Sequence, residues 1–240
     1  MKRAFQREHL ERIKRRQSGY RLLLLALSLI LLLQPLAVEL PIINSIGPIA
    51  LALVIMWCLI RNSALLARKR LMFTIGGLAI FSELIWLGSL YLHLPWVLHL
   101  AIPRLIIWSL FIGLFLVRMT RALMLEPYVT LAVVMGAAAG YLLIGYFGAL
   151  LLNTLLLWQP EAFNLALLPP AVDPLREPTR TFPALLLASL GSLTTTGTSI
   201  TLPNRLLGST ASLVIALLGQ LYVAVLIALV LGRFHQRRGR

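Results

Sequence analysis

Residues 194–199, TTTGTS, are the segment of this 240-residue chain best suited to chemistry, because they place five hydroxyls around one glycine with no charge among them. Hydroxyl and backbone carbonyl oxygens can replace the water shell of a cation that is being dehydrated. The segment therefore indicates an ion-binding path. Its candidate ligands are Thr194, Thr195, Thr196, Gly197, Thr198 and Ser199.

Other kinds of chemistry lack their residues in this sequence. It has no glycine-rich phosphate loop, catalytic triad, paired carboxylates or cluster of metal ligands. The single cysteine, Cys58, lies in an apolar run and offers neither a disulfide framework nor a cysteine-based metal site. We therefore expect no enzyme, no cofactor, and no metal site apart from the cation path suggested by the hydroxyl-rich segment.

Composition indicates an integral membrane protein. Apolar residues make up 59% of the chain and charged residues only 12%, which a single water-soluble core cannot accommodate. The formal charge of +14 lies in the two tails and two short connections, and no basic face is interleaved with aromatic residues. We therefore expect no nucleic-acid partner and explain the charge by membrane topology.

Six apolar windows are long enough to cross a bilayer as helices. They lie near 22–40, 42–60, 71–92, 94–117, 128–152 and 206–232. The first two are separated only by ELPIIN, so we expect a tight hairpin turned at Pro41 and Asn44. The fourth window is interrupted by Pro95, Pro103 and Arg104 and is assigned because the topology requires it. The predicted fold class is an all-α membrane protein with six transmembrane helices.

The distribution of arginine and lysine supports that count. Cations crowd the first 21 residues, the 61–70 connection, the connection with Arg118 and Arg121, and the carboxy-terminal tail, whereas the connections at 40–44 and 153–205 are near neutral. Because cations favour the cytoplasmic side, we expect a multi-pass protein of the cell membrane, the bacterial inner membrane, with both termini cytoplasmic. The basic amino-terminal tail suits either anionic lipid or solvent.

The connection before the last window is long enough to hold a re-entrant element. Its first part, WQPEAFNLALLPPAVDPLREPTR, is dense in proline and predicts a loop without regular structure. The following segment, Phe182 to Leu193, predicts a helix that starts beside Pro183 and is too short to span. Non-helical backbone at membrane depth is tolerated where it lines a water-filled path. We therefore expect a re-entrant pore helix followed by a filter loop.

At these residues the chain resembles the tetrameric pore-loop cation channels, in particular the potassium-channel pore domain. The usual filter of that family, TTVGYGDITP, aligns without a gap to 194–203, TTTGTSITLP. The segment ALLGQLYVAVLIALVLGRF, Ala216 to Phe234, is similar to the inner helix of bacterial members. The resemblance covers Tyr128 to Phe234 and implies a homotetramer whose filter residues face a shared axis. It also makes Gly219 a candidate gating hinge, although glycines in spans serve equally as packing notches.

Three of the filter's departures from the family pattern bear most on its function. Thr198 replaces the usual tyrosine, Ser199 the second glycine and Ile200 the acidic residue. Glycine permits filter backbone angles that other residues adopt at a cost of about 1 kcal/mol or more. The expected function is a monovalent cation channel that discriminates weakly between potassium and sodium. A non-conducting pore-fold scaffold or regulatory subunit is the alternative. TTTGTS is also similar to the single-glycine filters of Trk-type potassium transporters, a more distant possibility.

The predicted topology and the resemblance together divide the chain into four parts. These are a basic cytoplasmic tail (1–21), a four-span sensor-like domain (22–126), a pore domain (127–234) and a cytoplasmic tail (235–240). A voltage sensor repeats arginine along its fourth span, and here that span holds only Arg104. One such charge in each of four subunits supplies about 9 kcal/mol per 100 mV, whereas steep voltage gating uses tens of kcal/mol. We therefore expect no strong voltage gating.

Two charged residues lie inside predicted spans at matching depths. Glu83 follows Arg70 by thirteen residues, and Arg104 precedes Arg118 by fourteen, on adjacent antiparallel helices. Because an unpaired charge inside a bilayer costs at least about 2.5 kcal/mol, the pattern predicts a buried Glu83–Arg104 ion pair. Alternatively, the break at Pro103 lets Arg104 reach the outer interface while Glu83 is protonated or bonded to a hydroxyl.

Four glycines in the fifth window predict a surface for close helix contact. They are Gly136, Gly140, Gly145 and Gly148, and the first two are the ends of the segment GAAAG. Small residues at such spacing allow neighbouring helices to approach closely in membranes. The pattern therefore favours a packing seam in this window.

Overall fold

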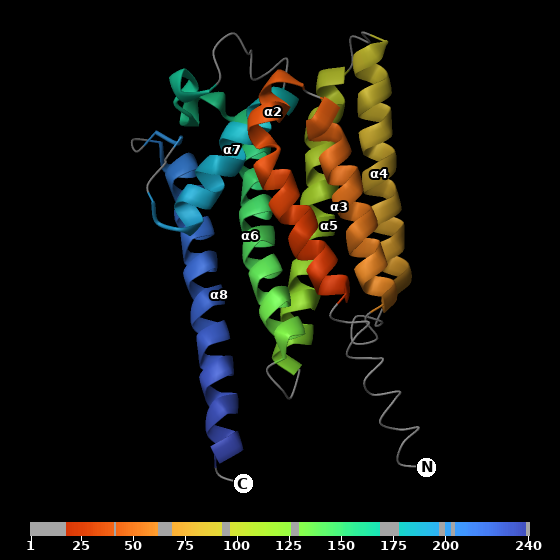
Figure 1. The fold of residues 1–240 in the computed structure, drawn as a ribbon. Coiled ribbons are helices and arrows are strands. Elements are labelled where there is room, and N and C mark those ends of the chain that lie inside the picture. Colours follow the sequence, from red (N-terminus) through yellow and green to blue (C-terminus); the bar gives the residue numbers. More distant parts are fainter. Residues whose placement is uncertain are drawn as a thin grey trace.

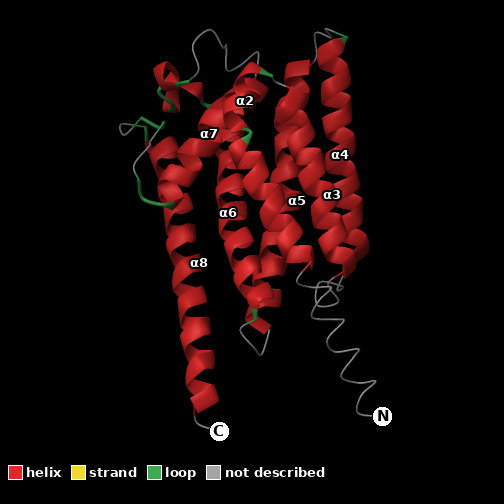
Figure 2. Ribbon diagram, in the orientation of Figure 1, coloured by secondary structure: helices red, strands yellow, loops and turns green. Residues whose placement is uncertain are grey.

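A computed structural model describes residues 18–40, 42–61, 69–92, 97–125, 130–168, 178–196, 200–202 and 205–238. These residues are almost entirely helical, and no strand longer than an isolated bridge occurs among them (Figure 2). The α-helices are a first helix at Ser18–Leu32, α2 (Gln34–Glu39), α3 (Ile42–Arg61), α4 (Lys69–Tyr91), α5 (Val97–Leu125), α6 (Leu131–Trp158), α7 (Pro178–Leu193) and α8 (Leu206–Arg238). Two short 3-10 helices, η2 (Pro160–Ala162) and η3 (Leu165–Leu167), follow α6.

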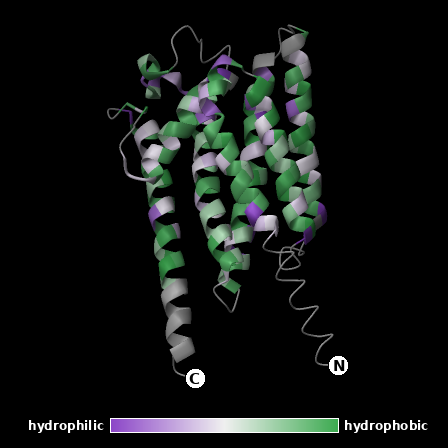
Figure 3. Ribbon diagram, viewed as in Figure 1, coloured by the Kyte–Doolittle hydropathy of each residue, from purple (hydrophilic) through white to green (hydrophobic). Residues whose placement is uncertain are grey.

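Five of the described helices are long and apolar enough to cross a membrane. They are Ile42–Arg61, Arg70–Ser89, His99–Leu125, Leu131–Trp158 and Leu206–Ala228. Large apolar side chains are exposed along the outside of the bundle, and apolar residues predominate along its helices (Figure 3). Such a surface suits lipid rather than water. The described part of the chain is therefore compatible with a multi-pass helical membrane protein.

The first predicted span, 22–40, is interrupted. The first helix ends at Leu32, a turn follows at Leu33, and α2 contributes only six further residues. Pro35 explains the break, because it has no N–H for the carbonyl four residues earlier and its ring crowds that carbonyl. The prediction of one continuous helix in this window was wrong.

The predicted hairpin between the first two windows has a specific hydrogen bond. α2 ends at Glu39, and α3 begins at Ile42. The Asn44 side-chain amide, on α3, donates to the backbone carbonyl of Ala37 on α2 at 3.2 Å. Asn44 thus joins the two helices from inside α3 rather than from the turn itself. Pro41, the other predicted turn residue, lies outside the described residues.

The fourth predicted window belongs to a longer helix. α5 runs without a break through Pro103 to Leu125, so Arg118 and Arg121 lie on its last turns rather than in a connection. Pro103 falls within the first two turns, where the missing N–H removes a single bond to His99. The long apolar run that follows is sufficient to keep the helix intact.

The helices pack into one continuous bundle (Figure 1). The amino-terminal bundle, which we define as residues 18–125, contacts α6, and α6 in turn packs against α7 and α8. Trp108, Phe111, Phe115, Leu51 and Ile55 lie in its buried core. α8 lies beside α6 and α7 at the edge of the bundle, and η2 and η3 lie at the end opposite the carboxy-terminal end of α8 (Figure 1).

Candidate functional site

The predicted half-length helix is present as α7, but it begins earlier than expected. It starts at Pro178 instead of Phe182, and Pro183 lies inside it. Proline suits the first helical position because its absent N–H would have no partner there. The 16 residues of α7 extend about 24 Å, which is shorter than the roughly 30 Å hydrocarbon core. The helix therefore cannot cross a bilayer along its normal.

α7 is bonded to the central helix α6 at both its middle and its end. The Ser189 hydroxyl, which is fully buried, donates to the carbonyl of Gly145 at 2.7 Å. The Tyr141 hydroxyl donates to the carbonyl of Leu193 at 3.2 Å, just before the hydroxyl-rich segment. These two bonds fix the carboxy-terminal half of α7 against α6.

The predicted glycine seam of α6 is confirmed as a packing surface. A Cβ at Gly145 would meet the Leu190 side chain, and one at Gly148 would meet the hydroxyl of Ser189, both on α7. The other two glycines face other helices, with Gly136 against Leu123 and Tyr20, and Gly140 against Tyr222. At each of these positions a side chain of another helix lies so close that any residue larger than glycine would displace it.

The first three residues of the predicted filter form a tight, exposed turn at the end of α7. The Thr196 N–H donates to the carbonyl of Gly191 at 3.0 Å, and the hydroxyls of Thr194 and Thr196 lie 3.1 Å apart. Thr195 has φ of 59°, a left-handed conformation that costs a non-glycine residue about 1–2 kcal/mol. Strain of this kind gathers at functional sites. Gly197, Thr198 and Ser199 lie outside the described residues.

Part of the proline-rich connection between α6 and α7 has regular structure, contrary to the sequence prediction. In addition to the turns η2 and η3, it forms hydrogen bonds with the segment that follows the predicted filter. The N–H of Asn164 donates to the carbonyl of Ile200 at 2.9 Å, and the N–H of Leu202 donates to the carbonyl of Ala162 at 3.0 Å. An isolated bridge joins Phe163 and Thr201. This connection therefore holds the backbone immediately after the predicted filter in place.

Gly219, the candidate hinge, lies in close contact with the end of α7. A Cβ at this position would lie 3.2 Å from the carbonyl oxygen of Leu193 and closer still to its side chain. One turn further along α8, the Tyr222 hydroxyl donates to the carbonyl of Ala137 on α6 at 3.0 Å. Both contacts favour the packing reading of Gly219 over the hinge.

α8 leaves most of its surface uncovered, and that surface includes a polar residue that sequence reasoning missed. Only 17% of its apolar window is buried within the chain. Gln220 is exposed between Leu217 and Leu221, which are exposed by 52% and 61%. An amide within an otherwise apolar run was the available signal. Its exposure here points to surroundings that contain water or another polar group.

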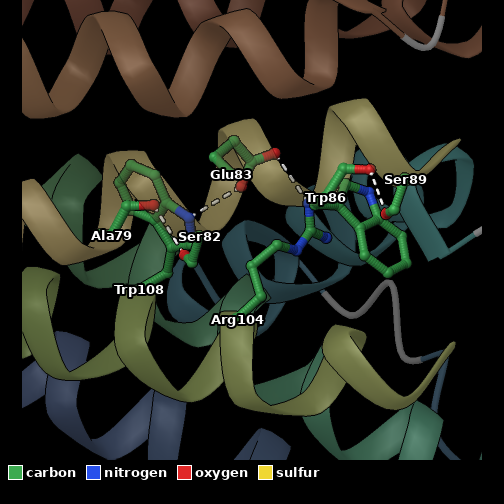
Figure 4. A network of polar contacts seen from close by, with 7 residues as sticks. All are labelled: Ala79, Ser82, Glu83, Trp86, Ser89, Arg104 and Trp108. Atoms are coloured by element: carbon green, nitrogen blue, oxygen red, sulfur yellow. Dashed lines mark hydrogen bonds and ion pairs between the residues drawn. The ribbon is translucent and has the colours of Figure 1, made fainter. Parts of the chain in front are cut away.

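Glu83 and Arg104, the two residues expected to pair, lie in contact between α4 and α5 (Figure 4). Arg104 Nη1 donates to Glu83 Oε1 at 2.8 Å, and Trp108 Nε1 donates to Glu83 Oε2 at 2.9 Å. The Arg104 guanidinium also lies over the Trp86 ring, 4.4 Å from its centroid. Only 5% of Arg104 and 2% of Glu83 are exposed. The alternative in which Arg104 reaches the outer interface does not match this geometry.

The chain matches no protein-family model, no curated protein and no solved structure. Inferences about its function therefore rest on the α7 turn, the hydrogen bonds between 162–164 and 200–202, and the uncovered face of α8.

Proposed function

We propose that the chain assembles as a homotetramer that conducts monovalent cations, potassium and sodium, with weak discrimination between them. The observation that carries this proposal is a helix too short to span, α7, which ends in three exposed threonines between the two long helices α6 and α8. A single loop of this kind cannot enclose an axial path. Four copies related by cyclic symmetry can do so.

The electrostatics of the α7 terminus suit a cation. The carboxy-terminal end of a helix carries a partial negative charge, because the peptide dipoles of the helix are aligned along its axis. Thr194, Thr195 and Thr196 follow directly and add exposed hydroxyl oxygens. A dehydrated cation at this place would meet oxygen ligands in a favourable field.

The uncovered face of α8 fits the inner wall of such a pore. A polar amide exposed to lipid near the middle of a span is unfavourable, so Gln220 is better placed toward water. Leu217 and Leu221 flank it and offer apolar contact to neighbouring copies. In the proposed tetramer, four Gln220 side chains surround the ion path below the filter.

The amino-terminal bundle is proposed to act as a fixed scaffold rather than a voltage sensor. The only cation expected in the field, Arg104, is held by Glu83 and by the Trp86 ring. Moving this guanidinium across the membrane would break a buried pair and leave both charges uncompensated. Voltage is therefore expected to have little effect on opening.

Cysteine substitution at position 220 tests the proposal. The natural chain has a single cysteine, Cys58, which is 1% exposed and gives a low background. We expect a charged, water-soluble thiol reagent to modify Gln220→Cys and to block cation flux in proteoliposomes. The matched control is Leu218→Cys, which lies on α8 against a groove shared with α5 and should conduct after the same treatment.

The assembly itself is tested by mass. A measurement of the detergent-solubilised protein should give four copies per particle. A folded monomer or dimer would remove the basis of the pore, as would modification of Gln220→Cys that leaves a measured flux unchanged.

A further inference from the structure

A small cavity with several polar residues in its lining lies beside the Glu83–Arg104 pair. Its volume is about 20 Å³, and residues of α3, α4, α5, α6 and α7 line it. The cavity therefore sits where the amino-terminal bundle meets the two helices that support the filter segment. Its polar lining residues are Asn44, Glu83, Arg104, Trp108, Tyr146 and Asn153.

Three of the lining residues carry a buried polar atom that lacks a hydrogen-bond partner among the described residues. These atoms are Nε of Arg104, the hydroxyl of Tyr146 and Oδ1 of Asn153. The residues are exposed by only 5%, 2% and 1%. Buried polar atoms are nearly always bonded, so three unbonded atoms around one cavity indicate a shared partner that is not part of the chain.

The three atoms are complementary in hydrogen-bonding capacity. Arg104 Nε can only donate, Asn153 Oδ1 can only accept, and the Tyr146 hydroxyl can do both. A single molecule with two donors and two acceptors can bond all three. A cation would be repelled by the Arg104 guanidinium, and an anion would face the Glu83 carboxylate.

We propose that one ordered water molecule occupies this cavity. It accepts hydrogen bonds from Arg104 Nε and the Tyr146 hydroxyl and donates one to Asn153 Oδ1. The cavity volume is the space open to the centre of a water molecule, and one water needs roughly 10–15 Å³ of such space. The cavity therefore admits one water and leaves no room for a larger ligand. Buried waters typically make about three hydrogen bonds, the number that these atoms offer.

The water connects the buried ion pair to α6, and through α6 to α7. Tyr146 and Asn153 lie seven residues apart on α6, and so on one face of that helix. The Tyr146 ring also contacts the Phe182 ring of α7 edge-on, with centroids 5.4 Å apart. The bridge thus runs from Arg104 on α5 through water to the helix that holds α7 in place. It does not depend on whether the pore conducts.

Replacing Tyr146 by phenylalanine tests the water through the sign of a stability change. If the hydroxyl bonds to water, Tyr146→Phe lowers the midpoint of thermal unfolding. If the cavity is dry, the same change removes an unsatisfied polar atom and raises the midpoint. Tyr222→Phe is the matched control, because its hydroxyl donates to the carbonyl of Ala137 and its loss should lower the midpoint in either case.

Two further measurements make the test independent of one variant. Asn153→Leu keeps a similar volume and removes the acceptor, so combined with Tyr146→Phe it should lower the midpoint by less than the sum of the single losses, since both bonds share one water. An experimental map of the natural protein that resolves other buried waters should show one within hydrogen-bond distance of all three atoms. A map without it, or a midpoint raised by Tyr146→Phe, would overturn the proposal.

Discussion

Arg104 Nη1 lies 2.8 Å from Glu83 Oε1, so α5 and α4 are joined by an ion pair that is almost fully buried. Both carboxylate oxygens of Glu83 are bonded, since Trp108 occupies the second. Removing one partner of a buried pair leaves the other charge uncompensated, whereas removing both leaves none. This asymmetry makes the pair testable.

We predict that Glu83→Gln and Arg104→Gln each lower the free energy of unfolding by about 3–5 kcal/mol, and that the double variant loses much less than their sum. Trp108→Phe serves as a control that removes a single hydrogen bond to Glu83. Thermal or denaturant unfolding of the four proteins in detergent gives the coupling energy. Additive losses would mean that the two charges do not depend on each other.

Gly219→Ala should destabilise the protein, because its Cβ would press on the Leu193 carbonyl and side chain. Overpacking of this kind costs about 1–3 kcal/mol. Gly88→Ala is the matched control, since a Cβ at Gly88 meets nothing within 4 Å, and alanine in a helix is favoured over glycine by about 0.5–1 kcal/mol. Unfolding midpoints should therefore move in opposite directions. An unchanged midpoint for Gly219→Ala together with altered opening would restore the hinge hypothesis.

Thr195→Gly should leave the unfolding midpoint unchanged or raise it slightly. The left-handed conformation at φ 59° costs threonine about 1–2 kcal/mol, which glycine avoids, while the greater freedom of glycine in the unfolded chain offsets about 0.5–1 kcal/mol. Thr194→Gly is the comparison, because the Thr194 hydroxyl donates to the carbonyl of Leu190 at 2.8 Å and no left-handed strain is relieved there. If Thr195→Gly were as destabilising as Thr194→Gly, the turn would not be strained.

The helices that surround the site could be predicted from the sequence, because long apolar runs have few alternatives in a membrane. The start of α7 was placed four residues late, since apolar content rises only at Phe182 while the helix already begins at Pro178. Pro35 and Pro103 look alike in sequence, but only Pro35 lies at a break, since the first helix ends at Leu32 and α2 begins at Gln34, whereas α5 runs through Pro103. The difference lies in the helix that follows each proline, because α5 continues from Pro103 to Leu125, whereas α2 ends at Glu39.

Two features of the site could not be predicted for a different reason. The contact between 162–164 and 200–202 consists of backbone hydrogen bonds, which any residue type can make. The exposure of Gln220 depends on how α8 packs, and an all-round apolar helix has no periodicity that predicts its buried face. By contrast, the contact between Glu83 and Arg104 could be predicted, because two opposite charges inside spans have few other partners.

Restoring three filter residues should raise the preference for potassium. The changes are Thr196→Val, Thr198→Tyr and Ser199→Gly, made together. Ile200 should be left in place, because it is 5% exposed within an apolar cluster and an aspartate there would bury a charge. We expect the permeability ratio of potassium to sodium to rise about tenfold or more, equivalent to about 1.4 kcal/mol. Thr194→Ser is the control. If the permeability ratio changed equally in the triple variant and in this control, the three positions would not determine selectivity.

The central claim, a weakly selective monovalent cation pore, is tested most directly by the reversal potential of the purified tetramer in a planar bilayer with potassium on one side and sodium on the other. We predict current carried by both ions and a permeability ratio below about tenfold, because less than about 1.4 kcal/mol separates them. A potassium preference of about a hundredfold, roughly 2.7 kcal/mol, would contradict weak selectivity. A complete absence of current from verified tetramers would contradict the pore itself and favour a non-conducting scaffold.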